Sequence, residues 1–131
     1  MSTLTISNLN DGTTTLATTY VTNGSAKVWC NWNGTSTAAI RDSFGVSSLT
    51  DNGSGDFTFA YTSSFASANY TTGGHHAHSS AITDYVYHVQ LREDSAATAS
   101  NARLLTVYVG ATASGLQDYP NCNFTSHGDL A

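Results

Sequence analysis

The sequence predicts an all-β protein, an antiparallel β-sandwich of about seven or eight strands with a short polar N-terminal arm. Three observations predict this fold: short stretches in which apolar and polar residues alternate, Gly- and Asn-containing turns between them, and no helical period sustained for three turns. With 131 residues, of which 40% are hydrophobic, the chain is long enough for one domain with one core. We expect residues 1–25 to form the arm or a first strand, and residues 26–131 to form the sandwich.

Charged residues are scarce in this chain. They make up 10% of it, the formal net charge is −5, and the four basic residues are scattered along the sequence. A nucleic-acid partner or an anionic membrane surface requires clustered cations, so we expect neither as a partner. No apolar run approaches the roughly 20 residues that span a bilayer, and the N-terminus lacks the pattern of a secretory signal. The polar surface must therefore consist mainly of Ser, Thr, Asn and Gly, which suits an extracellular or particle surface.

Residues 1–25 are polar and rich in Thr, Asn and Gly. Their early apolar residues are Leu4, Ile6 and Leu9. Two interpretations remain open: a loosely ordered leader, or an arm that reaches a neighbouring subunit and becomes ordered only in the assembly.

The first clear strand signal is Lys27–Trp32. Val28, Cys30 and Trp32 share one face of this alternating segment and are expected in the core, whereas Trp29 points outward. Asn33-Gly34 then supplies a turn. Further strands are expected within Ile40–Leu49, over Asp56–Tyr61, from Asn69, and over Asp84–Glu93 and Arg103–Ala111.

Within these strands the alternation assigns a core face. It places Phe57, Phe59, Tyr61, Tyr85, Tyr87, Val89, Leu91, Leu105, Val107 and Val109 inward. Residues 73–78 are expected to form a loop, and short helical turns are expected near Ser64–Ala68 and Ala96–Ala99. The final segment, Thr112–Ala131, contains the only proline and is polar and short, which puts a last strand in doubt.

One part of the chain resembles a known family. The segments that carry the resemblance are Ala26-Lys27-Val28-Trp29, Asn31-Trp32-Asn33-Gly34-Thr35, Ala39–Phe44, Val46–Gly53, Gly55–Thr58 and Asn69-Tyr70, with a similar opening at Met1–Leu9. They are similar to a β-module found in virion structural proteins of marine tailed bacteriophages, often in tail-fibre-like proteins. The similarity covers roughly a third of the chain.

The resemblance implies a viral structural protein rather than an enzyme. We expect a non-enzymatic component of the virion exterior, made in the host cytoplasm and placed in a tail fibre or as a capsid decoration. Its expected partners are identical copies, as a homotrimer, and other virion proteins. The alternative is a carbohydrate-binding, host-recognition module that holds a host surface glycan. No catalytic or cofactor-binding residue is assigned.

A histidine cluster is the sharpest chemical feature. His76 and His78 form an HxH pair preceded by His75, and on an extended segment the two rings of the pair point to the same side. Three copies around an axis would then offer six imidazoles to one transition metal. The competing interpretation is a solvent-exposed loop after Gly73-Gly74, and we assign no metal site.

Several side chains are candidates for contact with a partner or ligand. They are Trp29, Arg41, Tyr70, Tyr108 and Tyr119. The aromatic members, if exposed, favour either sugar stacking or contact between protein surfaces. Arg41 is expected to pair with an acid, either in its own domain or across a subunit interface.

The remaining acids and thiols indicate structural roles. Asp51 and Asp56 stand where turn residues commonly bond their own backbone. Cys30 is expected to be buried, which raises its pKa and makes it inert. Pairing of Cys30 with Cys122 is left open.

Overall fold

A computed structural model of the protein describes residues 3–77, 85–92 and 97–131. The elements follow one another as β1 (Asn8–Asn10), β2 (Thr15–Ala17), α1 (Thr18–Gly24), β3 (Val28–Asn33), β4 (Ala39–Phe44), β5 (Val46–Gly53), β6 (Asp56–Tyr61), β7 (Thr71–Ala77), β8 (Tyr85–Leu91), β9 (Asn101–Gly110), β10 (Ser114–Leu116) and β11 (Asn121–His127). The all-β fold predicted from the sequence is confirmed.

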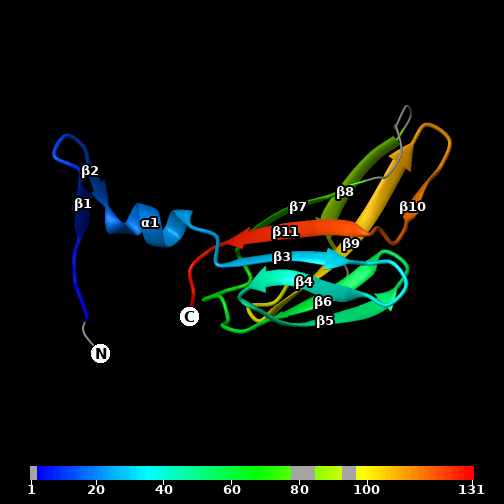
Figure 1. The fold of residues 1–131 in the computed structure, drawn as a ribbon, viewed down its shortest axis with the longest axis horizontal. Helices are drawn as coiled ribbons and strands as arrows, with labels where there is room; N and C mark the ends of the chain where they lie inside the picture. Colours follow the sequence, from blue (N-terminus) through cyan, green and yellow to red (C-terminus); the bar gives the residue numbers. More distant parts are fainter. Residues whose placement is uncertain (1–2, 78–84, 93–96) are drawn as a thin grey trace.

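Most strands belong to one antiparallel sheet of nine strands. Its order is β4-β3-β11-β7-β8-β9-β6-β5, with β10 paired to β9 beyond the end of β6. The sheet curls into a nearly closed, flattened barrel (Figure 1). Its two outermost strands, β4 and β5, are consecutive in the sequence and are joined at Gly45, which has a φ of 74°. The left-handed backbone there favours glycine, because a Cβ would lie 2.6 Å from the carbonyl oxygen of Lys27.

An aromatic cluster fills the barrel. Trp32 of β3 packs edge-on against Phe59 of β6 with ring centroids 4.8 Å apart, and Phe59 lies equally close to Phe124 of β11. Phe57 meets Trp32 from the same strand as Phe59. All of these side chains are buried. The alternating faces predicted for β3 and β6 are therefore correct, because each strand buries every second side chain.

Two strands occupy segments where the sequence signal was weak. β7 covers the Gly73-Gly74-His75-His76 segment that was expected to be a loop, and that expectation is wrong. β11, in the segment whose last strand was in doubt, lies between β3 and β7 inside the sheet. The packing of β7 explains why residue 74 is a glycine. A Cβ on Gly74 would lie 2.6 Å from the Asn123 carbonyl oxygen and 3.1 Å from Val89. Only glycine allows the neighbouring strands to approach this closely.

The face predicted for β9 needs correction. Val107 is buried as predicted, but Leu105 is only half-buried and Val109 is exposed, whereas Ala102, Leu104 and Thr106 are fully buried. The register with β6 sets this face, since Leu104 lies opposite Phe57 and Ala102 lies opposite Phe59. In β8, Val89 is buried as predicted but Leu91 is exposed at the strand end. The side chain of Tyr85 lies outside the described part.

Helical structure occurs where the sequence did not predict it. α1 lies in the N-terminal arm, whereas residues 64–68, all of which the structure describes, contain no helical turn. Part of the second predicted turn, Ala96–Ala99, lies outside the described residues. α1 is only seven residues long, too short to produce a recognisable helical period in the sequence.

The arm consists of the β1–β2 hairpin followed by α1, and it extends away from the barrel (Figure 1). Asp11 holds the hairpin turn by accepting hydrogen bonds from the backbone N–H groups of Thr13 (2.9 Å) and Thr14 (2.7 Å). These bonds hold the pKa of Asp11 below its usual value, with the bond from Thr14 the main cause. No residue of α1 is buried, and its last turn leads directly into β3.

Candidate functional site

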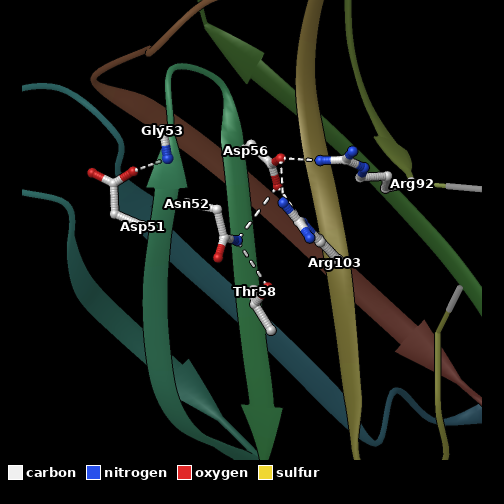
Figure 2. Close-up of polar contacts among 7 residues, drawn as sticks. All are labelled: Asp51, Asn52, Gly53, Asp56, Thr58, Arg92 and Arg103. Atoms are coloured by element: carbon white, nitrogen blue, oxygen red, sulfur yellow. Dashed lines mark hydrogen bonds and ion pairs between the residues drawn. The ribbon is translucent and has the colours of Figure 1, made fainter. Parts of the chain in front are cut away.

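The most buried carboxylate of the described residues belongs to an ion cluster at the β5–β6 turn (Figure 2). Asp56 receives two parallel hydrogen bonds from Arg103 on β9, Nε to Oδ1 at 2.7 Å and Nη2 to Oδ2 at 2.8 Å. Arg92 adds a bond from Nη1 to Oδ2 at 2.5 Å. Asn52 lies alongside, donating at 3.4 Å to Asp56 and at 2.9 Å to Thr58. The cluster links β5, β6 and β9 with the end of β8.

This cluster revises one prediction and supports another. Asp51 bonds the backbone N–H of Gly53 at 2.9 Å, as expected of a turn residue, whereas Asp56 is an ion-pair partner and not a turn cap. The bond from Arg103 is the main cause that lowers the pKa of Asp56, and Arg92 acts in the same direction. A carboxylate held ionised by two guanidinium groups favours a fixed structural charge over proton transfer.

A second polar region occupies the outer surface of four neighbouring strands, β4, β3, β11 and β7. We call it the aromatic-amide face and define it by eight residues that the strand registers place in two rows: Phe44, Trp29, Thr125 and Gly73 in the first, and Asp42, Asn31, Asn123 and His75 in the second. Residues directly opposite one another in antiparallel strands project from the same side of the sheet. The face therefore runs across all four strands.

The first row of this face is aromatic at one end and flat at the other. Trp29 is 39% exposed and Phe44 59% exposed, and the two are directly paired on β3 and β4. At the opposite end, a Cβ on Gly73 would meet nothing within 4 Å, so the sheet surface is open there. The prediction that Trp29 points outward is correct.

The second row is polar throughout. Asn31 and Asn123 are half-buried, whereas Asp42 and His75 at the two ends are exposed. Asp42 Oδ1 accepts a hydrogen bond of 2.9 Å from the neighbouring Ser43 backbone. With strands spaced about 4.8 Å apart, four side chains span about 14 Å. The row offers amide, carboxylate and imidazole groups in a line beside the aromatic pair.

Arg41 lies just beyond these rows, at the β-bulge where the β3–β4 register shifts. Its Nη1 donates to Asn121 Oδ1 on β11 at 2.5 Å. Within the part of the chain that the structure describes, its partner is thus an amide and not the expected acid. The bulge accounts for this, because it turns Arg41 across β3 towards β11.

Two of the predicted exposed aromatics are buried. Tyr70 stacks on Phe65 with centroids 4.2 Å apart and donates to the Asn101 carbonyl at 2.9 Å. Tyr119 is almost fully buried, and burial raises its pKa to about 12. Both belong to connecting segments that close the barrel, a placement that local alternation cannot reveal. The expectation of exposure was wrong for both, and Tyr108 is half-buried.

The HxH surface pair that the sequence left as a candidate is not formed, because His76 is buried. His76 points into the barrel, where its ring stacks on Tyr119 at 3.8 Å and meets Tyr87 edge-on at 5.4 Å. Its Nε2 lies 3.3 Å from the Val107 carbonyl oxygen. A ring buried in this way cannot reach a metal on an axis between subunits. His78 lies outside the described residues, and His75 belongs to the opposite, outer face.

The cysteines lie on neighbouring strands as buried free thiols. Burial raises the pKa of Cys30 and that of Cys122 to about 12 each, as the sequence predicted for Cys30. Cys122 Sγ lies 3.4 Å from the Tyr119 carbonyl oxygen. Among the described residues, no three His, Cys, Asp or Glu side chains are close enough to hold a metal ion.

A hollow lies at the junction of the arm and the barrel. It is an open groove of about 650 Å³ with Val21 of α1 on one side and Phe44 and Leu130 on the other. Lys27 also lines the groove and donates hydrogen bonds to the Ser25 carbonyl at 3.0 Å and to the Thr22 carbonyl. The three apolar side chains that line the groove are all exposed.

The arm has a mainly polar composition, yet its few large apolar side chains are exposed. Its apolar side chains that remain exposed are Leu4, Ile6, Leu9, Leu16, Tyr20 and Val21. None of them is covered by the barrel core, all of whose members lie between Val28 and Phe124. Of the helices in the described ranges, none is both long and apolar enough to cross a bilayer.

Comparisons of this chain with protein-family models, with curated proteins and with solved structures find no match.

Proposed function

We propose that this chain is a non-enzymatic structural subunit of the exterior of a bacteriophage particle, in a tail fibre or as a capsid decoration. In this proposal the barrel is the displayed domain and the N-terminal arm is the attachment segment. The arm holds identical copies together as a homotrimer and fixes them to other virion proteins. The sequence resemblance to marine phage virion proteins supports the viral assignment, and the scarcity of charge suits a particle surface.

The observation that carries the proposal is the arm. A two-stranded hairpin is at best marginally stable in water, and so is a helix of seven residues. Here the two are joined, bury no residue of the helix, and expose four large apolar side chains, with Leu4 and Ile6 also exposed just before the hairpin. Such a segment gains its stability by burying those side chains against another chain.

The construction of the barrel supports the same division of roles. Its core cluster takes no residue from the arm. The arm can therefore change partners or conformation without disturbing the displayed domain. The apolar groove where α1 meets Phe44 and Leu130 offers a docking place for a neighbouring arm.

The experiment compares the full chain with a chain that begins at Ala26. Light scattering measures molar mass, and thermal unfolding checks that the barrel is intact. We expect the full chain to associate and the shortened chain to be a monomer with a similar melting temperature. Cryo-electron microscopy of the particle then locates the barrel on its exterior.

A double variant, Leu9→Ser with Leu16→Ser, refines this test. The two residues are directly paired in the hairpin, so the variant removes apolar surface from one face of the arm. The matched control is Val86→Ser on β8, which removes a side chain that is also exposed but lies on the barrel. Association that survives arm removal, or a full chain that stays monomeric and is absent from particles, contradicts the proposal.

A further inference from the structure

We propose that the aromatic-amide face binds a neutral sugar unit of a glycan, with Trp29 as the stacking platform and Asp42 and Asn31 as the hydroxyl partners. This goes beyond the structural role, because it assigns a ligand-binding activity to a defined surface of the barrel. The arm contributes no residue to the eight that define the face, and one of these eight, Phe44, also lines the groove beside the arm.

The aromatic pair supplies the platform. Trp29 and Phe44 are large, exposed and adjacent, and they stand on paired strands and not on loops. An exposed aromatic ring on a rigid strand offers apolar area with little side-chain entropy to lose on binding. One face of a pyranose ring carries a patch of C–H groups, which fits such a ring. Trp29 has buried neighbours on either side, Val28 and Cys30, which hold its backbone in place.

The polar row supplies the directional contacts. In the register, Asn31 is flanked directly by Asp42 and Asn123, with His75 at the far end. A carboxylate accepts two hydroxyl hydrogen bonds, and an amide both donates and accepts. Sugar hydroxyls also donate and accept. A pyranose ring that stacks on Trp29 would place its hydroxyl groups over Asn31, which is the next outward residue of the same strand.

The flat end of the first row leaves room for the ligand. Gly73 has no side chain, and open space lies over it. The surface beyond Thr125 is therefore low at Gly73. With a span of about 14 Å across the four strands, the face admits more than a single ring.

The charge on the face selects a neutral ligand. Asp42 is the one carboxylate of the two rows, and the guanidinium of Arg41, which donates to the neutral amide of Asn121, keeps its positive charge nearby. These two opposite charges give the face little net attraction for an ionic ligand. A neutral, hydroxyl-rich ligand needs no such attraction.

A second copy of this chain is a poorer occupant of this face. A flat apolar surface laid over it would cover Asn31, Asn123 and Asp42 without replacing their water hydrogen bonds, which costs free energy. The arm, by contrast, exposes aliphatic side chains, which suit contact between proteins. The two surfaces therefore differ in the chemistry of the partner that each one fits.

The test titrates the full chain with neutral oligosaccharides and follows the fluorescence of tryptophan. Maltohexaose, cellohexaose, mannohexaose and galactohexaose are the probes, and heparin is the anionic comparison. Trp32 is fully buried, so a shift in emission on binding reports Trp29. We expect at least one neutral probe to bind with a Kd of about 1 mM or tighter, with calorimetry as the second readout.

Three variants locate the site. Trp29→Ala and Asp42→Asn should each weaken binding about tenfold or more, as measured by calorimetry because Trp29→Ala removes the reporter. Val86→Ala, which trims an exposed side chain of β8, should leave binding unchanged. Thermal unfolding confirms that each variant is folded.

The outcomes separate this proposal from its rivals. Absence of binding by every neutral probe at about 10 mM, or binding of heparin alone, overturns it. Binding of a neutral oligosaccharide that is unchanged in both Trp29→Ala and Asp42→Asn also overturns the proposal. Loss of self-association in Trp29→Ala shows that the face is a subunit interface instead. Removal of residues 1–25 should lower the molar mass to that of a monomer and leave sugar binding intact. A failure of the arm proposal would therefore appear in the molar mass alone, and a failure of the sugar proposal in the binding alone.

Discussion

The barrel and the N-terminal arm differ in where their stabilising contacts come from. In the barrel, rings from β3, β6 and β11 meet in one cluster, so residues far apart in the sequence hold one another. In the arm, hydrogen bonds join near neighbours, such as Asp11 with Thr14 and Thr18 with Ser7. Its apolar side chains are left facing water.

This difference teaches that regular backbone structure and independent stability are separate properties. The arm has two strands and a helix, yet it lacks the buried area that offsets the entropy of ordering a chain. The barrel has both the regular structure and the buried area. Substitutions in the two regions should therefore behave differently even where the local interactions look alike.

The largest contrast is expected from core truncation. Phe59→Ala removes a fully buried ring that contacts Trp32 and Phe124, and we expect it to lower the free energy of unfolding by about 3–5 kcal/mol. Leu16→Ala in the hairpin of the arm should change it by less than about 0.5 kcal/mol. Urea denaturation measures both. Similar losses for the two variants would mean that the arm is part of the cooperative unit.

A smaller contrast concerns two aspartates whose pKa values are both lowered. Asp56→Asn removes a charge bonded by Arg103 and Arg92, and should cost about 1.5–3 kcal/mol at neutral pH. Asp11→Asn should leave barrel unfolding unchanged at every pH, because Asp11 lies in the exposed turn of the arm.

The pH dependence sharpens the Asp56 prediction. Its folded-state pKa lies below the unfolded value of about 3.9, so its stabilising contribution is complete above that pH. The contribution is lost as the pH falls through the folded pKa. The difference in unfolding free energy between the natural protein and Asp56→Asn should therefore narrow in acid. A difference that stays constant from neutral pH into acid would exclude this ion pair as its source.

The smallest contrast is between two adjacent glycines of β7. A Cβ at Gly74 would press on the Asn123 carbonyl oxygen at 2.6 Å, so Gly74→Ala should cost about 1–3 kcal/mol. Gly73→Ala places its Cβ in open space and should be close to neutral. The melting temperatures of the Gly73→Ala and Gly74→Ala variants measure this difference. Equal destabilisation would mean that glycine flexibility, and not the close approach of strands, explains both residues.

The sequence predicts those parts of the barrel in which alternation is strong and local. In β3 and β6 every second residue is a large apolar one, so both the strand and its buried face follow from the pattern. β7 was missed because glycines and histidines there are typical of a loop, and their meaning depends on strands that lie far away in the sequence. The alternation of Cys122, Phe124 and Ser126 in β11 was present but weak.

The candidate binding face shows the same limit. Alternation places Trp29 on the outside, but it does not show that Phe44 lies beside it or that Asn123 lies beside Asn31. Those neighbours depend on strand order and register, which a single sequence does not specify. Tyr70 and Tyr119 illustrate the converse, because their burial arises from connections that cross the barrel ends.

The position of β3 has a mechanical consequence. The arm enters the barrel directly at β3, which is flanked on both sides, by β4 and by β11. A pull applied through the arm along β3 loads the hydrogen bonds of both ladders in shear, so many bonds must break together. Trp29 and Asn31 stand on this same strand. Tension between an anchored arm and a ligand held on that face would run along a strand that is paired on both sides, and not across the boundary between β4 and β5, which are not paired with each other.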